Sequence, residues 1–177
     1  KVTAEGTHPN LFMVGLAPSG AGKDFGRKLT RDTLYRAGFS DVLGAEVLSS
    51  GEGFVKSLET QNVQLFQLDE IAEMFGEMGD ANHYMAKTGK LLKQAYSSSG
   101  DPEWKPNCRA DAKNNIIVRE PFPIIYGTTT PDLFYSRFSP DSVNDGLLGR
   151  LLIFSQEHYD ISLGRIYKQM TATESIV

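Results

Sequence analysis

A glycine-rich turn between an apolar run and a helix-like segment constrains the fold of this chain more than any other feature. Residues 11–17, LFMVGLA, are almost all apolar, which predicts a strand buried on both faces, as in parallel sheets. Residues 17–23 read APSGAGK, and residues 22–38 have helical spacing that closes at Gly38. A strand, a glycine-rich turn and a helix in this order predict a loop that cradles phosphates, although an ordinary strand-to-helix turn has the same pattern.

We expect this loop and the first turn after it to contact a nucleotide, with ATP and Mg²⁺ as the cofactors. Lys23 would neutralise the β- and γ-phosphates. Asp24 is unusual, because a Ser or Thr hydroxyl normally holds Mg²⁺ at this position. Its carboxylate would ligate Mg²⁺, repel the β-phosphate, pair with Lys23, or simply be an acid in the first turn of a helix. The expected nucleotide contacts are Pro18, Ser19, Gly20, Ala21, Gly22, Lys23, Asp24 and Phe25.

A second apolar run ends in two acids. Residues 63–71, VQLFQLDEI, predict a strand, after which Asp69 would hold Mg²⁺ and Glu70 would act as general base on a water molecule. The alternative is a strand followed by an ordinary acidic helix start. Between the loop and these acids we expect a short strand over 45–50 and a helix over 51–60, and after them a helix over 81–96.

The last third of the chain carries a set of threonines and an arginine of interest. Residues 122–131 predict a strand that brings Thr128 or Thr129 to the γ-phosphate as a sensor, unless the threonines only cap the next helix. Residues 146–154 predict a helix end that runs into a last strand. Arg150 enters this apolar run, so we expect it to act in hydrolysis, as an arginine finger in a neighbouring subunit, or to pair with an acid. Arg137 is the weaker candidate for the same role.

A polar stretch over 97–115 predicts a loop or hairpin tip. Its aromatic and basic residues suit base stacking and phosphate contacts with single-stranded DNA, although a solvated loop has the same composition. The residues concerned are Trp104, Lys105, Arg109 and Lys113. Three lysines of the predicted helix before it, Lys87, Lys90 and Lys93, fall on one side, which more often indicates a solvated face.

Composition favours one compact domain in a reducing compartment. The chain has 177 residues, a net charge of -4 and a sequence pI of about 5.4, so DNA contact would need a local basic patch. Cys108 is the single cysteine, and no apolar run reaches the roughly 20 residues of a membrane span. Strands that alternate with helices predict an α/β fold with a parallel sheet flanked by helices. We therefore expect a cytoplasmic protein without a membrane partner.

Four segments together resemble a known family: LFMVGLAPSGAGKD, LFQLDEI, PFPIIYGTTTPDLF and DGLLGRLLIF. They look like the helicase-like ATPase domain of phage and mobile-element primase–helicase proteins, over about residues 9–155, with 156–177 as a C-terminal extension. The resemblance implies a RecA/AAA+-like three-layer P-loop NTPase, with the acid-bearing strand beside the loop strand. It also implies functional roles for Lys23, Asp69, Glu70 and Arg150.

The same resemblance implies a function and its partners. ATP hydrolysis would drive single-stranded DNA through a ring, expected to be a hexamer, in the cytoplasm of a bacterial host. A hairpin over 98–115 would read the DNA, and a primase is a further expected partner. Two alternatives stay open: a DNA packaging or recombination ATPase, and a regulator that binds nucleotide without hydrolysing it because Asp24 spoils the metal site.

Overall fold

A four-stranded, all-parallel sheet lies at the centre of the computed structural model, which describes residues 10–80, 82–107, 115–138 and 146–155. The strands are β1 (Phe12–Leu16), β2 (Val63–Leu68), β3 (Phe122–Thr129) and β4 (Leu151–Ser155), in the order β2-β3-β1-β4. Every neighbouring pair is parallel. The predicted α/β class with a parallel sheet is therefore confirmed.

The pairing register of the strands determines which residues lie together at their carboxyl ends. Leu16, at the end of β1, pairs with Thr129 of β3 and with Ser155 of β4, and Leu68 of β2 pairs with Gly127. The segments that follow these strands therefore leave from one edge, where ligands of parallel sheets bind. Because β3 lies between β1 and β2, the expectation that the acid-bearing strand is beside the loop strand was wrong.

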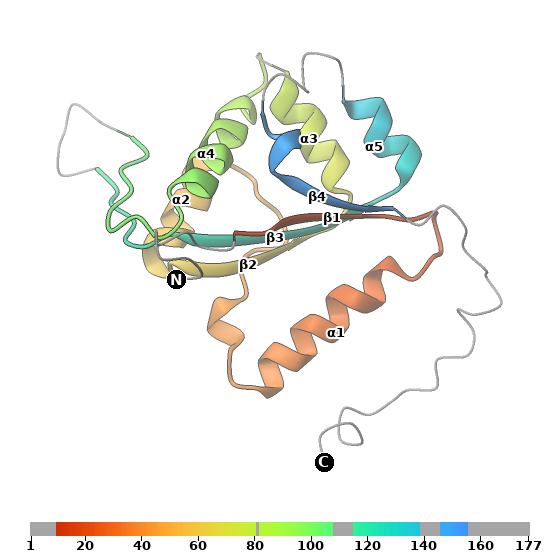
Figure 1. The fold of residues 1–177 in the computed structure, drawn as a ribbon, viewed down its shortest axis with the longest axis horizontal. Helices are drawn as coiled ribbons and strands as arrows, with labels where there is room; N and C mark the ends of the chain where they lie inside the picture. The colour runs from red at the N-terminus through yellow and green to blue at the C-terminus, as the bar shows by residue number, and fades with distance from the viewer. Residues whose placement is uncertain (1–9, 81, 108–114, 139–145, 156–177) are drawn as a thin grey trace.

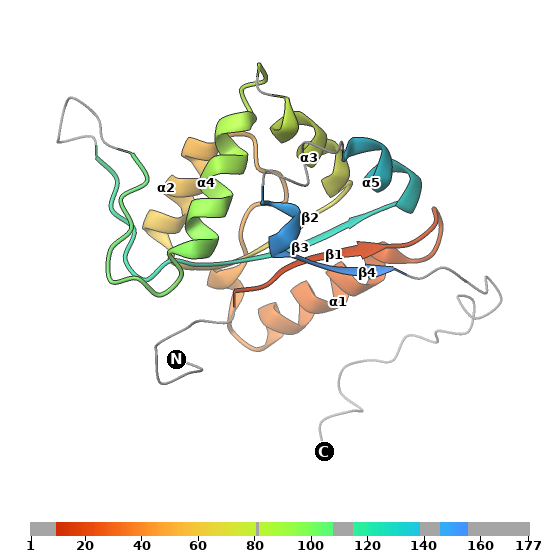
Figure 2. The same ribbon diagram turned by 45° about the horizontal axis from the view of Figure 1, so that its top comes forward.

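Helices cover the two faces of the sheet unequally. Helix α1 (Lys23–Arg36) lies on one face, and α2 (Gly51–Thr60), α3 (Ile71–Gly79), α4 (Ala86–Ser97) and α5 (Pro131–Arg137) lie on the other (Figure 1; turned in Figure 2). The main core lies on the side of the four helices, where Phe54 of α2 packs on Phe66 of β2 with ring centroids 5.4 Å apart.

Strand β1 shows the effect of this unequal cover. Phe12, Val14 and Leu16 are buried, whereas the two residues between them are only half-buried. Helix α1 has no buried residue of its own, so it covers its face of the sheet loosely. The apolar run of β1 predicted burial on both faces, and that prediction was wrong because one of the faces has only this helix over it.

Several predicted elements are present with shifted ends. The helix over 51–60 is confirmed as α2, with Phe54, Val55 and Leu58 buried and with Ser50 capping it through a 3.1 Å bond from the Gly53 N–H. The strand over 63–71 ends at Leu68. The helix over 81–96 corresponds to α4, which begins at Ala86, and α3 precedes it as a separate helix.

The predicted strand over 45–50 is absent from the structure. Val47 is 71% exposed while Leu48 is buried, and the isolated bridge nearby joins Leu43 to Leu65. The segment instead leads directly into the cap of α2. Residues 98–107 lead to a hairpin base, where Trp104 and Val118 exchange backbone hydrogen bonds of 2.7 and 2.9 Å. In the described part of the chain, no helix is long and apolar enough to span a membrane.

Candidate functional site

The loop between β1 and α1 depends on two glycines in left-handed backbone conformations. Gly20 has φ 79° and Gly22 has φ 77°, and Gly22 is the N-cap of α1. A side chain at these positions would strain the backbone, which explains the glycine pattern. The Ala21 N–H donates to the Pro18 carbonyl at 3.2 Å, closing the turn. Lys23 folds back over the loop and donates to the Ala17 carbonyl at 3.1 Å.

Residues of this loop line a small hollow together with the acidic pair. We call it the loop hollow; it measures about 330 Å³ and is lined by Ser19, Gly20, Gly22, Lys23, Asp24, Asp69 and Glu70. The fold thus brings together the loop lysine and the two acids at the end of β2, which are far apart in the sequence. Both groups directly follow strands of one parallel sheet, and the carboxyl ends of such strands meet at the same side of the sheet.

A larger hollow of about 590 Å³ adjoins the loop hollow, and we call it the strand hollow. It shares Gly22 and Lys23 with the loop hollow and adds Ala21, Thr128 and the apolar side chains of Ile153 and Phe154. Together the two hollows place the glycine loop and Lys23 beside the exposed apolar side chains of β4. Three of the predicted nucleotide contacts, Pro18, Phe25 and Thr129, line neither hollow.

Two buried threonines of β3 hold the acidic pair in place. The Thr128 hydroxyl donates to Asp69 Oδ1 at 3.2 Å, and the Thr129 hydroxyl donates to Glu70 Oε2 at 3.0 Å. Glu70 has the left-handed backbone angles φ 43° and ψ 44° and donates its N–H to Asp69 Oδ1 at 3.0 Å. Thr130 occupies the N-cap of α5 without a side-chain cap bond. The threonines therefore position carboxylates here, a role that sequence reasoning missed.

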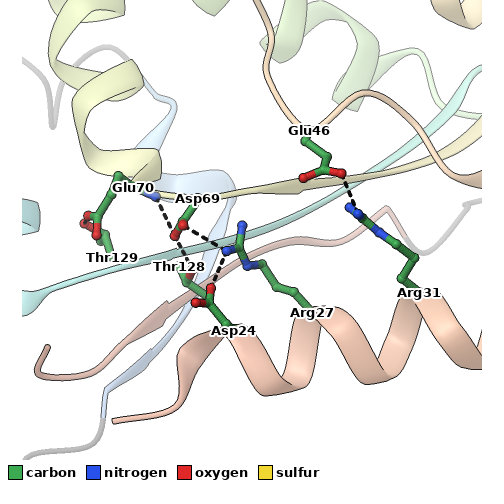
Figure 3. Close-up of polar contacts among 8 residues, drawn as sticks. All are labelled: Asp24, Arg27, Arg31, Glu46, Asp69, Glu70, Thr128 and Thr129. Atoms are coloured by element: carbon green, nitrogen blue, oxygen red, sulfur yellow. Dashed lines mark hydrogen bonds and ion pairs between the residues drawn. The ribbon is translucent and has the colours of Figure 1, made fainter. Parts of the chain in front are cut away.

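Asp24 pairs with Arg27, which bridges it to Asp69 (Figure 3). The Nη2 atom of Arg27 bonds Asp24 Oδ1 and lies 2.9 Å from Asp69 Oδ2. The expected alternative of an Asp24–Lys23 pair was wrong, because the lysine folds onto the Ala17 carbonyl instead. Sequence reasoning missed Arg27; the signal for it was its position three residues after Asp24 on one helix face.

The ion pairs shift the pKa values of two of these groups. The hydrogen bond and the charge of Arg27 lower the pKa of Asp24 below its ordinary value of 3.8. Burial would lower the pKa of Arg27, but the hydrogen bonds and charges of Asp24 and Asp69 outweigh burial and raise it. Both groups are therefore charged at neutral pH.

The oxygen donors of the loop hollow fit a magnesium ion only together with a nucleotide. The carboxylate oxygens of Asp24 and Asp69, and the hydroxyl of Thr128 in the adjoining strand hollow, are of the hard type that Mg²⁺ prefers, with phosphates as the other ligands. In the described residues, no three His, Cys, Asp or Glu side chains form a cluster able to hold a metal without such help. Asp69 and Asp24 thus remain the expected ligands.

Arg150 lies at the amino ends of the strands, whereas the loop lies at their carboxyl ends. It ends a short 3-10 helix, Leu148–Arg150, and precedes Leu151, which pairs with Phe12 at the start of β1. The five residues of β1, about 15 Å at roughly 3.3 Å per residue, separate it from the loop of its own chain. The structure therefore does not bring Arg150 to that loop, and a role in a neighbouring subunit stays a prediction. Arg137 packs against Gly76 of α3 and lines neither hollow.

Around Arg150 the chain forms a second candidate site, which we call the basic hollow. It measures about 620 Å³ and is lined by Lys90, Lys93, Gln94, Ser97, Ser98, Trp104, Lys105 and Arg150. Arg150 donates to the Gly146 carbonyl at 2.7 Å and to the Ser97 hydroxyl at 3.2 Å, and its guanidinium lies 5.7 Å from the ring centroid of Tyr96. These three contacts hold the guanidinium in place, and none of them is made with an acidic side chain.

The predicted DNA-binding residues have different outcomes. Lys105 lines the basic hollow with its side chain 63% exposed and pairs with Glu103 at 3.1 Å. Trp104 is 5% exposed and belongs to the hydrophobic core, so the expectation that its ring stacks on a base was wrong. Arg109 and Lys113, like Cys108, lie outside the described residues.

No protein-family model matches this chain, and no curated protein matches it either. Its function therefore has to be inferred from the geometry of the loop hollow and the basic hollow.

Proposed function

We propose that this chain is the ATP-hydrolysing motor domain of a P-loop helicase that acts on single-stranded DNA. The observation that carries the proposal is the loop hollow, in which the glycine loop and Lys23 face Asp69 and Glu70. Backbone N–H groups of such a loop and the N-terminus of α1 favour phosphate, and the ammonium of Lys23 adds positive charge. A lysine and two carboxylates at one strand edge are the groups that phosphoanhydride hydrolysis needs.

In this proposal the side chains divide the work of one hydrolysis step. Lys23 holds the β- and γ-phosphates, and Asp69 with Asp24 holds Mg²⁺, which offsets charge on the phosphate oxygens. Water attacks the γ-phosphorus, its proton passes to the Glu70 carboxylate, and the bond to the β-phosphate oxygen breaks to give ADP and phosphate. The Thr129 hydroxyl donates to Oε2 of Glu70, so it orients the carboxylate and leaves Oε1 to accept that proton.

ATP turnover with and without single-stranded DNA tests the motor. We expect DNA-stimulated hydrolysis by the native chain, and a loss of about a hundredfold or more in Glu70→Gln with nucleotide binding retained. Glu73→Gln, in the first turn of the same helix, is the matched control and should keep full turnover. Unchanged turnover in Glu70→Gln would show that another group is the base.

The basic hollow supports the DNA part of the proposal. Lys90, Lys93, Lys105 and Arg150 converge on it from α4, the hairpin and the residue before β4, and none of its described lining residues is a carboxylate, although the chain as a whole is acidic. Converging cations attract a phosphate backbone and release its counterions, although Lys105 also pairs with Glu103 at the rim of the hollow. Of the three lysines predicted to form a solvated face, Lys87 and Lys90 are exposed and Lys93 is half-buried. Lys87 pairs with Glu52 at 3.0 Å, and the other two line the hollow.

Binding of a fluorescent oligothymidine tests this surface. Lys90→Glu and Lys105→Glu should each weaken binding by about tenfold at low salt and reduce its salt dependence. Lys56→Glu, an exposed charge reversal on α2, controls for the change in net charge and should have a small effect. Equal losses in all three variants would mean that only net charge matters, and would remove the basic hollow from the proposal.

A second function is favoured by the ion pairs of the loop hollow. Arg27 occupies Asp24 and Asp69, and Thr129 holds Glu70, so the resting arrangement also suits a regulator that binds nucleotide without turnover. Tight nucleotide binding with no hydrolysis, with or without DNA, would select this function. Recovery of turnover in Asp24→Ser would then identify Asp24 as the cause.

A further inference from the structure

Arg27 does not itself line the loop hollow, but it pairs with two acids that do, and it is the most enclosed member of this ion-pair network. Its side chain is 15% exposed, against 60% for Asp24 and 53% for Asp69. One nitrogen, Nη2, contacts oxygens of both carboxylates, which come from different elements, α1 and the segment after β2 (Figure 3). The guanidinium therefore ties the phosphate loop's helix to the acid-bearing strand.

This bridge stands where a shared metal ion would stand. An ion held jointly by Asp24 and Asp69 needs a short distance to oxygens of both carboxylates, and Arg27 already contacts one oxygen of each. The remaining Asp69 oxygen accepts from the Thr128 hydroxyl and the Glu70 N–H. Arg27 and a bridging Mg²⁺ therefore compete for the same carboxylates.

The loop hollow needs a neighbouring cation because its own lining side chains carry a net negative charge. Lys23 faces Asp24, Asp69 and Glu70, so the hollow without Arg27 is negative and would repel a triphosphate. Arg27 forms a charge-assisted hydrogen bond with Asp24. The net charge of this pair is zero, the same as that of the neutral hydroxyl usual at position 24. The arginine thus compensates within the protein for the acid in the loop.

We propose that Arg27 is the resident cation of the nucleotide site, so that this chain binds ATP without Mg²⁺. The inference rests on the proposed nucleotide binding. It assigns Arg27 a positioning role: it keeps Asp24 and Asp69 neutralised and in place while the triphosphate enters. Magnesium is then needed for turnover and not for binding.

The test is the dissociation constant of a fluorescent ATP analogue, measured in EDTA and in Mg²⁺. For the native chain we expect the two values to agree within about tenfold. Arg27→Gln should weaken binding in EDTA by about tenfold or more, because the acids then repel the phosphates, and should keep binding in Mg²⁺. Asp24→Ser combined with Arg27→Gln should restore binding in EDTA, which a misfolded variant could not do.

The chain offers a matched control one turn further along α1. Arg31 pairs with Glu46, outside both hollows, so Arg31→Gln removes an ion pair of the same helix and should bind like the native chain in both buffers. Native binding in Mg²⁺ alone would overturn the inference and leave the proposed function standing. Native binding in neither buffer would overturn both, and equal binding by Arg27→Gln and the native chain in EDTA would overturn the inference.

Discussion

Gly22 links the backbone geometry of the loop to its chemistry. It holds φ 77° at the N-cap of α1, and a Cβ atom there would meet no neighbour within 4 Å. The cost of Gly22→Ala is therefore conformational, about 1–2 kcal/mol of the free energy of unfolding. Relaxation of the backbone to relieve that strain would turn the loop N–H groups away from the hollow. The loss in free energy of nucleotide binding should therefore exceed the loss in free energy of unfolding. Urea unfolding and nucleotide titration check both; Gly149→Ala, with open space and an ordinary backbone, should change neither.

The Asp24–Arg27 pair gives stability a specific dependence on pH. The pKa of Asp24 is lowered in the folded chain, so its contribution is complete above the ordinary value of 3.8 and is lost as pH falls through the folded value. The difference in urea midpoint between the native chain and Asp24→Asn should be constant from about pH 7 to 5, should shrink as pH falls below 3.8 and should vanish below the lowered pKa of Asp24. Because Asp24 is exposed, the difference should be small. A difference that grows on acidification would contradict this assignment.

At the residue scale, the sequence predicted side chains whose role depends on local pattern. Lys23 follows its glycines directly, and Asp69 and Glu70 follow their strand, so spacing alone identified them. Arg27 and the contacts of Thr129 escaped prediction, because each depends on which strand end approaches which helix. Such approaches are set by the tertiary packing of segments far apart in the chain.

At the element scale, α3 is placed by its close contact with β3. A Cβ atom on Gly127 would lie 2.3 Å from Cδ1 of Ile71, the fully buried first residue of α3. Gly127→Ala should therefore cost about 1–3 kcal/mol through overpacking. It should also displace Glu70, which precedes Ile71, and so lower turnover beyond the loss of folded protein.

A neighbouring glycine provides the comparison for that variant. Gly15 of β1 would place a Cβ atom 3.8 Å from Thr128, an ordinary contact, so Gly15→Ala should leave the thermal midpoint nearly unchanged. A similar loss in both variants would indicate a general sensitivity of the sheet to side chains rather than a specific contact with α3.

Prediction of the elements succeeded where apolar periodicity was strong and failed where it was not. Helix α2 and strands β2 and β3 were found because Phe54, Phe66 and Ile125 belong to clear patterns of buried residues. Residues 45–50 were assigned to a strand from composition, yet Leu48 is buried while Val47 is exposed in an irregular segment. Strand order was not predictable, because nothing local to β1 distinguishes β2 from β3 as its neighbour.

At the scale of the whole molecule, strand β4 exposes an apolar surface. Leu152, Ile153 and Phe154 are 48%, 41% and 62% exposed on a strand that has one paired neighbour, β1, among the described residues. An apolar edge strand favours association with another chain, as the proposed ring requires. Phe154→Lys should therefore lower the fraction of oligomer measured by analytical ultracentrifugation. The thermal midpoint of unfolding should stay within a few degrees of the native value. Persistence of the oligomer would place the ring interface elsewhere.

The pairing of β1 also determines when the proposed nucleotide site forms during synthesis of the chain. Phe12 pairs with Ile125 and Leu151, so β1, the first of the described strands, finds its partners only among the last described segments. Closing such long loops is slow, and parallel pairing between distant segments delays folding. On the ribosome, the phosphate loop leaves the exit tunnel early but has no sheet to support it until β3 and β4 follow. Nascent chains that end before β3 should consequently be unable to retain nucleotide, however long they are given to fold.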